Sequence, residues 1–277
     1  MIKKVIIWGV GLMGGSFALA LRRKKVARQI LGIFRNKRRL KKACNLGIVD
    51  EGILEKDIRE VVEEDCCIVM ALPVYVIIEK IRFLKDLDYR DCWIMDMGST
   101  KYQIIKEAKR FFKDRFVGVH PLAGSEKSGF EYADSRIFEK SICIICEDSP
   151  ASIYFIRRTA SIFKKIGSKV VYMNSKTHDK ILAFTSHLPH LLSFGLSLTV
   201  PSSFLEYSSG GLRSMLRISK STPSVWRDVF FSNVKELKKC LKNFRGNLTL
   251  LEKAIEDKDA RCLESLLKKS QSKSLKI

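Results

Sequence analysis

The segment VIIWGVGLMGGSFALAL, residues 5–21, constrains the fold more strongly than any other part of the chain. Gly9, Gly11 and Gly14 form the pattern G-x-G-x-x-G directly after a β-branched run, which is typical of a phosphate-binding turn between a strand and a helix. The same run follows two lysines and could instead be the apolar part of an export signal. The closely spaced glycines would interrupt such a part, so we expect a nucleotide-binding turn that stays in the mature protein.

Strand-like and helix-like segments alternate along the first part of the chain. Short β-branched runs lie at residues 4–9, 29–34, 66–73, 92–98, 116–121, 141–147 and 168–173. Segments with helical periodicity lie between several of them, at residues 16–24, 37–46, 74–84 and 100–112. This alternation predicts an α/β fold with a Rossmann-type, doubly wound, mainly parallel sheet.

Beyond residue 173 the strand signals fade and apolar helical periodicity replaces them. It covers residues 175–200, 226–243 and 248–269, and a Ser- and Gly-rich loop is expected at 201–215. We therefore expect a dinucleotide-binding domain at residues 1–173 and an all-helical domain at 174–277. These helices are too apolar to be stable beside the sheet alone, which predicts a homodimer through the helical domain.

The formal net charge of +21 would attract nucleic acid, anionic lipid or small anionic metabolites. The basic runs carry neither an aromatic stacking pattern nor a DNA-binding motif, so we interpret them as a solvated surface and expect no nucleic-acid partner. No apolar run beyond the glycine turn looks long enough to span a bilayer, so we expect no membrane partner and a cytoplasmic location.

The cysteines lie mostly in apolar segments of a mid-sized chain, and we expect all eight to be reduced core thiols. Cys143 and Cys146 form a C-x-x-C pattern within a strand-like run. Their odd spacing directs the two side chains to opposite faces of a strand, so we expect no metal site there.

The end of the second predicted strand bears on cofactor choice. A dinucleotide-binding domain normally carries an Asp or Glu there, which binds the ribose hydroxyls. This chain has Phe34 followed by Arg35 and Asn36. Without the carboxylate nothing repels a 2′-phosphate, and Arg35 could pair with it, which favours NADP. The alternative is a solvated loop beside an NAD site that tolerates the missing acid.

Three of the four histidines lie in apolar surroundings that suggest a pocket. His120 follows a strand-like run, and His187 and His190 lie three residues apart on one helical face. Singly, each could equally be a hydrogen-bonded core residue, and H-x-x-H without a third ligand is weak as a metal site. We treat His178, beside Asp179 at a helix start, as structural.

Five motifs give the chain a resemblance to a known family. GVGLMGGSFALAL, DMGSTK, HPLAGSEKSGF, SHLPH and STPSVWRD occur in the order and at about the separation found in prephenate and arogenate dehydrogenases of tyrosine biosynthesis. The resemblance covers nearly the whole chain. It implies a Rossmann domain, a helical dimerisation domain, and an active site between the two.

The resemblance implies an oxidative decarboxylation of a small dicarboxylate cyclohexadienyl substrate. Hydride passes to a nicotinamide, carbon dioxide leaves, and prephenate gives 4-hydroxyphenylpyruvate or arogenate gives tyrosine. His120 matches the catalytic histidine, and Ser99 matches a serine that contacts it. The substrate site would comprise Ser125, Glu126, Ser186, His187, His190, Gly210, Arg217 and Trp226.

The expected cofactor site combines the glycine turn, the end of the second strand and the loops that follow later strands. It comprises Gly9, Gly11, Leu12, Met13, Gly14, Arg35, Asn36, Leu72, Pro73 and Ser99.

The sequence departs from the family pattern near Arg217, where Ser214 and Leu216 replace an expected Asp and Thr. This departure leaves open whether Arg217 is the carboxylate anchor and whether the substrate is prephenate or arogenate. Two other functions remain. One is a different Rossmann-plus-helical oxidoreductase, which would need a catalytic lysine where SHLPH stands. The other is a non-catalytic nucleotide-sensing or nucleic-acid-binding protein.

Overall fold

A computed structural model describes residues 1–62, 64–85, 92–125 and 127–275. The first part of the chain contains one sheet with the strand order β3-β2-β1-β4-β5-β6-β7-β8. Among the described strand pairs, β6–β7 is antiparallel and the others are parallel. The strands are β1 (Ile2–Trp8), β2 (Ala27–Phe34), β3 (Glu51–Leu54), β4 (Cys66–Met70), β5 (Trp93–Asp96), β6 (Phe116–Leu122), β7 (Ile142–Cys146) and β8 (Lys169–Met173).

This sheet confirms the predicted doubly wound, mainly parallel architecture. All seven predicted β-branched runs overlap a strand. β3 was not predicted from the sequence; it is a four-residue edge strand in which Ile53 alone is buried. A strand that short, with one apolar side chain directed inward, has no alternating pattern to recognise.

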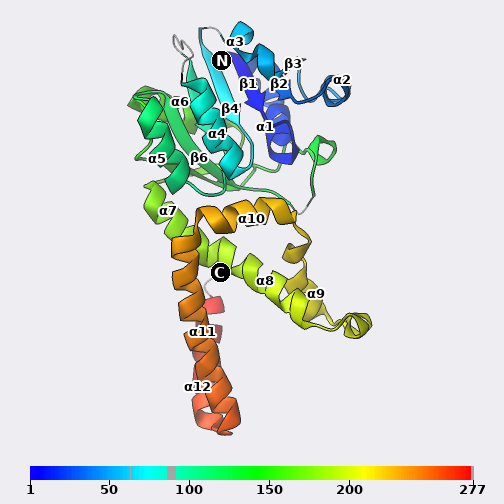
Figure 1. Cartoon of the computed structure of the whole chain (residues 1–277), viewed down its shortest axis with the longest axis vertical. Helices are drawn as coiled ribbons and strands as arrows, with labels where there is room; N and C mark the ends of the chain where they lie inside the picture. Colours follow the sequence, from blue (N-terminus) through cyan, green and yellow to red (C-terminus); the bar gives the residue numbers. More distant parts are fainter. Residues whose placement is uncertain (63, 86–91, 126, 276–277) are drawn as a thin grey trace.

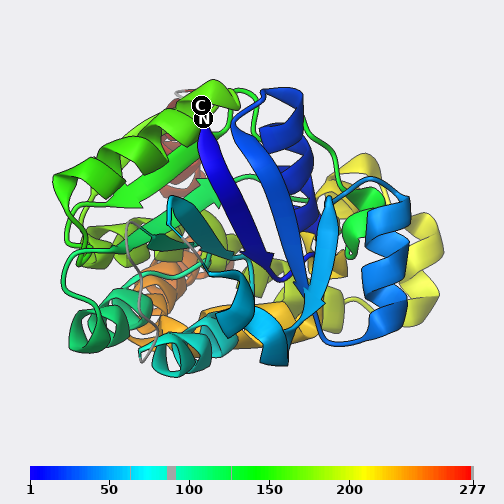
Figure 2. The ribbon, with the colours of Figure 1, turned by 90° about the horizontal axis from the view of Figure 1, so that it is seen from above.

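Helices cover both faces of the sheet (Figure 2). α1, α2 and α6 pack on one face, in a core built around Phe17, Phe138 and Phe163. α4 and α5 cover the other, where Ile77 and Ile104 are fully buried. The helices of this part are α1 (Leu12–Arg23), α2 (Lys37–Asn45), α3 (Ile58–Val61), α4 (Val74–Leu84), α5 (Tyr102–Phe111) and α6 (Ile153–Lys165).

The second part of the chain is helical, as predicted, and lies beyond one edge of the sheet (Figure 1). α10 contacts α4, while α11 and α12 extend together away from the sheet. Its helices are α7 (Ser175–Leu182), α8 (Leu188–Thr199), α9 (Gly210–Leu216), α10 (Pro223–Ser232), α11 (Val234–Glu256) and α12 (Ala260–Ser274), with a π-helical turn at Ala183–His187.

Four expectations for this part are corrected. The segment 226–243 is not one helix, because α10 ends at Ser232 and α11 begins at Val234; likewise 248–269 spans the break between α11 and α12. Residues 201–215 are not a plain loop, since they contain a 3₁₀ segment and most of α9. The continuous helix Ser175–Thr199 is long and apolar enough, by length and composition alone, to cross a membrane, contrary to the expectation of no such run.

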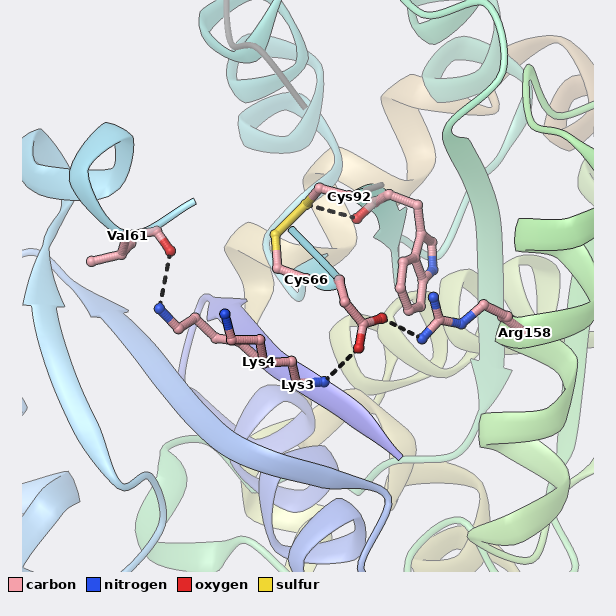
Figure 3. The surroundings of a disulfide bond; sticks show 8 residues. Lys3, Lys4, Val61, Cys66, Cys92 and Arg158 are labelled. Atoms are coloured by element: carbon pink, nitrogen blue, oxygen red, sulfur yellow. Dashed lines mark hydrogen bonds and ion pairs between the residues drawn. A yellow bond between two sulfur atoms is a disulfide. The ribbon is translucent and has the colours of Figure 1, made fainter. Parts of the chain in front are cut away.

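The cysteines are the other correction. Cys66 and Cys92 form a disulfide in the structure, with their Cα atoms 4.7 Å apart, so the expectation that all eight are reduced is wrong (Figure 3). Cys66 opens β4 and Cys92 immediately precedes β5; adjacent parallel strands bring the two within bonding range. Cys143 and Cys146 are free and pack on opposite faces of the sheet, as the odd spacing predicted.

Candidate active site

A cavity of about 960 Å³ lies between the carboxyl ends of the sheet strands and the helical part of the chain. The strand order reverses between β1 and β4, and the loops that follow both strands line the cavity. Ligands of doubly wound folds bind in the crevice at such a reversal, and the volume is typical of a small-molecule site. The fold therefore supplies a ligand site where the sequence predicted one.

The glycine turn forms one wall of this cavity. Gly9 has φ +99°, and a Cβ there would lie 2.3 Å from the Ala71 carbonyl oxygen. A Cβ on Gly14 would lie 2.3 Å from the Gly9 oxygen, so Gly14 is required for α1 to pack against the end of β1, while Gly9 is required by its positive φ and by the close Ala71 carbonyl. Gly11, in contrast, faces open space and lines the cavity. The amino terminus of α1, which has no acidic residue in its first turn, is thus accessible to an anionic ligand.

A buried ion pair fixes the loop that carries Ser99. The Lys101 ammonium pairs with Asp96 and donates to the Val119 carbonyl oxygen at 2.6 Å, and both charged side chains are fully buried. Asp96 also accepts the Gly98 N–H at 2.8 Å. These contacts join the ends of β5 and β6, where Ser99 and His120 both line the cavity.

A second histidine, His178, contacts the Nδ1 atom of His120. His120 Nδ1 lies 2.8 Å from His178 Nε2, and His178 Nδ1 lies 2.8 Å from Asp179 Oδ1. Burial, followed by the proximity of His178, Lys101 and His187, lowers the pKa of His120 well below its ordinary value of 6.5. The imidazole is therefore neutral near pH 7 and can accept a proton.

Sequence reasoning did not connect these residues. His178 is 58 positions from His120, and α7 brings it to the end of β6 because Asp179 accepts the backbone N–H groups of Lys101 and Tyr102, at 2.7 and 2.9 Å. The pair His178–Asp179 at a helix start was the available signal. Nothing in the sequence indicated which strand it would meet.

The helical part contributes a π-helical turn to the cavity. Pro189 lies just beyond the turn and has no N–H to donate to the Thr185 carbonyl, which favours a locally widened helix. Ser186 and His187, both in the turn, and His190 in α8 line the cavity. The π-helical turn and the start of α8 together therefore bring Ser186, His187 and His190 to the cavity.

The two histidines of this segment have different environments. His187 is buried, the Asn233 amide nitrogen lies 3.1 Å from its Nδ1, and burial lowers its pKa to about 4. His190 stacks on Trp226, with ring centroids 3.6 Å apart, and its Nδ1 lies 2.9 Å from the Ser186 carbonyl oxygen. Burial also lowers the pKa of His190, and nearby Arg217 lowers it further.

Most of the predicted site residues meet in this one cavity. Those that line it are Gly11, Leu12, Met13, Leu72, Pro73, Ser99, His120, Ser125, Ser186, His187, His190, Arg217 and Trp226. Gly9 and Gly14 shape the turn behind its wall. The cavity as described does not reach Gly210, Arg35 or Asn36, and Glu126 lies outside the described residues.

The predicted cofactor residues at the end of β2 lie by a smaller hollow of about 400 Å³. Asn36 lines it together with Arg38, Arg39, Lys42 and Glu131. The Asn36 side chain caps α2 by accepting the Arg39 N–H at 2.9 Å. Arg35 is exposed and, among the described residues, is not part of this lining. Arg38, Arg39 and Lys42, three of the basic residues of α2, were not named as site residues from the sequence.

Lys127 also lines the main cavity and was not singled out from the sequence. It lies in the HPLAGSEKSGF motif, which was a sufficient signal, and its ammonium lies 5.2 Å from the Tyr132 ring centroid. It adds a second cation to the Arg217 guanidinium at the cavity. Two cations and three neutral imidazoles suit a ligand with more than one carboxylate.

Comparison with known proteins agrees with this geometry. Residues 17–172 match the family model "Prephenate dehydrogenase, nucleotide-binding domain", and residues 174–269 match "Prephenate dehydrogenase, dimerization domain". The chain is 29% identical to a prephenate dehydrogenase of Lactococcus lactis over 95% of this chain and 74% of that protein. It is 28% identical to a cyclohexadienyl dehydrogenase of Zymomonas mobilis over 99% of this chain and 96% of that protein.

A solved structure is similar over the whole chain. The prephenate dehydrogenase of Aquifex aeolicus, crystallised with hydroxyphenyl propionate and NAD+, superposes with a TM-score of 0.92 at 30% identity, covering 100% of this chain and 98% of the other. Since both halves match their respective family models in order, the chain belongs to the prephenate dehydrogenase family.

Proposed function

We propose that this protein catalyses the oxidative decarboxylation of a cyclohexadienyl dicarboxylate, prephenate or arogenate, with hydride transfer to a nicotinamide dinucleotide. The product is 4-hydroxyphenylpyruvate from prephenate or tyrosine from arogenate. One observation carries the proposal: a single cavity contains the open glycine turn at Gly11, the neutral imidazole of His120 and the cation of Arg217. A dinucleotide site, a base and a carboxylate anchor would thus all lie within reach of one bound substrate.

The residues at the glycine turn fit a dinucleotide. Gly11 leaves space for a pyrophosphate against the backbone, and the amino terminus of α1 provides N–H groups and a positive dipole end. When bound, the nicotinamide accepts the hydride from the ring carbon that bears the substrate hydroxyl. Leu72 and Pro73, which follow β4, and Ser99, which follows β5, would border the nicotinamide end.

His120 acts as the base in this proposal. As hydride leaves, the carbon–oxygen bond gains carbonyl character and the hydroxyl loses its proton, which a neutral imidazole accepts. The lowered pKa of His120 keeps the accepting form present near neutral pH. Ser99, on the neighbouring strand end, would orient the same hydroxyl. Loss of carbon dioxide then makes the ring aromatic and leaves its oxygen as a phenolate, which takes the proton back from His120 to give the phenol.

The helical part would bind the substrate carboxylates. Arg217 provides a permanent cation, and His187 and His190 provide imidazole donors, the latter stacked on Trp226. Ser125 and Ser186 would add hydroxyl donors, and Lys127 a second cation. In the proposed division into residues 1–173 and 174–277, the first domain would therefore provide the dinucleotide chemistry and part of the substrate site, including Ser125 and Lys127. The second domain would provide the rest of the substrate site, and the protein would act as a cytoplasmic homodimer.

NADP is the cofactor that we favour over NAD. No acid follows β2 to bind the ribose hydroxyls, since Phe34 is followed by Arg35 and Asn36. The nearby hollow adds Arg38, Arg39 and Lys42, of which only Lys42 has an acidic partner, Glu131 at 2.7 Å, among the ion pairs of the described residues. A 2′-phosphate would find several cations within reach of this strand end.

A crossed assay tests the proposal. Prephenate and arogenate are each combined with NAD and with NADP, and absorbance of the reduced nicotinamide is followed. We expect turnover with at least one substrate and a higher kcat/KM with NADP. Turnover with neither substrate would overturn the enzyme assignment, while preference for NAD would overturn only the cofactor assignment.

A further inference from the structure

The Nδ1 side of His120 is engaged by a chain of two side chains, His178 and then Asp179. His120 Nδ1 is 2.8 Å from His178 Nε2, and His178 Nδ1 is 2.8 Å from Asp179 Oδ1. The His178 side chain is fully buried and that of Asp179 is 4% exposed. Water therefore has little access to this chain of contacts, and each nitrogen must take its hydrogen-bonding role from its partner.

Asp179 sets the direction of the chain. Its Oδ1 accepts the Lys101 N–H and its Oδ2 accepts the Tyr102 N–H, so both oxygens are already used as acceptors by fixed backbone donors. The remaining neighbour, His178 Nδ1, must then be a donor. A neutral histidine that carries its proton on Nδ1 has a bare Nε2, so His178 accepts from His120 rather than donating to it.

The tautomer of His178 sets the tautomer of His120. Its Nδ1 carries the proton and donates to His178 Nε2, and its Nε2 is left with a lone pair. Reversing His178 would turn its bare Nδ1 toward the carboxylate, so that two acceptors would face each other without a proton between them. The buried Lys101 ammonium, held by Asp96 and the Val119 carbonyl, disfavours a second positive charge on either ring.

We propose that His178 and Asp179 are positioning residues that hold His120 in the tautomer with its proton on Nδ1, so that Nε2 can accept the proton of the substrate hydroxyl. The inference rests on the proposed function for the role of His120. In this step the hydroxyl O–H bond breaks and the proton binds His120 Nε2, which gives an imidazolium with both nitrogens protonated. The hydrogen bond to His178 is retained, and no proton passes on to Asp179.

The tautomer can be measured without turnover. The chain has four histidines, so labelling the imidazole rings with ¹⁵N gives a spectrum of four side chains, and the His120→Asn variant identifies the His120 signals by their loss. At pH 7 we expect His120 and His178 each to be protonated on Nδ1 and bare on Nε2. A parent protein in which His120 carries its proton on Nε2 would overturn the proposal, whatever its activity.

Two variants of His178 connect the tautomer to the rate. His178→Leu removes the acceptor, and we expect His120 to shift toward the Nε2-protonated form and kcat to fall by about ten- to a hundredfold, part of what a positioned base supplies. His178→Gln retains a carbonyl oxygen that can accept from Nδ1, and should recover most of the tautomer and of kcat. KM and dinucleotide affinity should change little in either.

The outcomes separate this proposal from the function on which it rests. If the parent protein turns over neither substrate but His120 has the expected tautomer, the proposed function is wrong. The conclusion that His178 and Asp179 set the tautomer of the His120 imidazole would still stand. If the enzyme is active and His178→Leu, folded by circular dichroism, keeps both its tautomer and its kcat, the proposal is wrong. Should His178→Leu fail to fold, the parent spectrum and His178→Gln still decide it.

Discussion

The sheet and the helical part bury their apolar side chains to very different extents. Within the sheet part, β4 is buried along its whole length, and Phe17, Phe116 and Phe163 are fully buried. In the helical part, large apolar side chains remain exposed; Leu198 is 89% exposed and Phe231 is 61% exposed. One chain is thus enough to complete the core of the sheet, whereas the helices have apolar surface that a second surface must cover.

The two parts also contribute different chemistry to the cavity. The sheet part provides the glycine turn, Ser99 and His120, all at the carboxyl ends of strands, while the helical part provides His190, Arg217 and Trp226. The backbone N–H groups of Lys101 and Tyr102, at the start of α5, donate hydrogen bonds to the Asp179 carboxylate and hold the two parts together. Changes in the sheet part should therefore mainly affect turnover and dinucleotide affinity. Changes in the helical part should mainly affect substrate affinity and assembly.

The largest effect should come from the base in the sheet part. His120→Asn retains a similar size and a hydrogen-bond donor but cannot take the proton, so kcat should fall by about 100- to 10,000-fold. Dinucleotide binding, measured by titration, should be preserved because the glycine turn is untouched. Near-normal turnover would mean that the sheet part does not supply the base, and His190 would be the next residue to test.

The pH dependence gives this prediction a second readout. His120 must be neutral to act, and burial lowers its pKa well below 6.5, so activity should persist as the pH falls below 6.5 and be lost only at the lowered value. The acidic limb of kcat/KM should therefore lie below pH 6.5 in the parent enzyme and be absent in His120→Asn. A limb unchanged by the substitution would assign it to another group.

The next largest effect should come from the helical part. Arg217→Ala removes the proposed carboxylate anchor and should weaken substrate binding by about 1.5 to 3 kcal/mol, the range for a hydrogen bond to a charged group. Calorimetric titration would show this loss with cofactor affinity unchanged. Arg213→Ala is the matched control, since Arg213 is an exposed arginine in α9 and the described cavity lining does not include it.

The control also discriminates between anchors. Ser214 and Leu216 replace residues expected beside Arg217, and Arg217 is exposed in the single chain. If Arg213→Ala weakens substrate binding and Arg217→Ala does not, then the anchor has moved by one helical turn. If neither substitution weakens substrate binding, the helical part does not provide the carboxylate anchor, and Lys127 in the sheet part becomes the candidate.

The exposed apolar surface predicts that assembly, rather than the single chain, stabilises the helical part. For a dimer that unfolds to monomers, each tenfold rise in protein concentration adds about 1.4 kcal/mol of apparent stability, so the unfolding midpoint should rise with concentration. Light scattering at micromolar concentration should give twice the chain mass. A monomer whose unfolding midpoint does not depend on protein concentration would show that the helical part is stable without a second chain.

The sheet part was largely predictable from sequence because its signals are local. A buried parallel strand requires a continuous apolar run, and the glycine turn requires its residues for steric reasons visible at Gly9 and Gly14. The helix boundaries of the second part were less predictable. A helical period continues through a break such as that at Asn233, so periodicity alone cannot locate the end of α10.

What the sequence could not provide are contacts between residues distant along the chain. The Cys66–Cys92 disulfide depends on the pairing of β4 with β5, and the contact of His178 with His120 depends on where α7 docks. The same holds for Lys101, whose buried ammonium donates to the Val119 carbonyl oxygen on the neighbouring strand β6. Each of these required the strand order before the residues could be brought together.

The smallest predicted effect concerns cofactor choice and returns to the sheet part. Arg35 follows β2, where the ribose-binding acid is missing, and it is exposed, so its pairing with a 2′-phosphate would be screened by water and salt. Arg35→Ala should raise KM for NADP about fivefold, equivalent to about 1 kcal/mol, and leave KM for NAD unchanged.

Arg28→Ala is the matched control, because Arg28 is an exposed arginine near the other end of β2 and its removal changes the net charge equally. If both variants raise KM for NADP alike, the general positive field attracts the cofactor rather than a local contact. If Arg35→Ala changes both cofactors equally, Arg35 does not read the 2′-phosphate, and Arg38 in the neighbouring hollow should be replaced next. Substrate affinity should be unchanged in all of these variants, since Arg35, Arg28 and Arg38 belong to the sheet part and are not among the residues described as lining the main cavity.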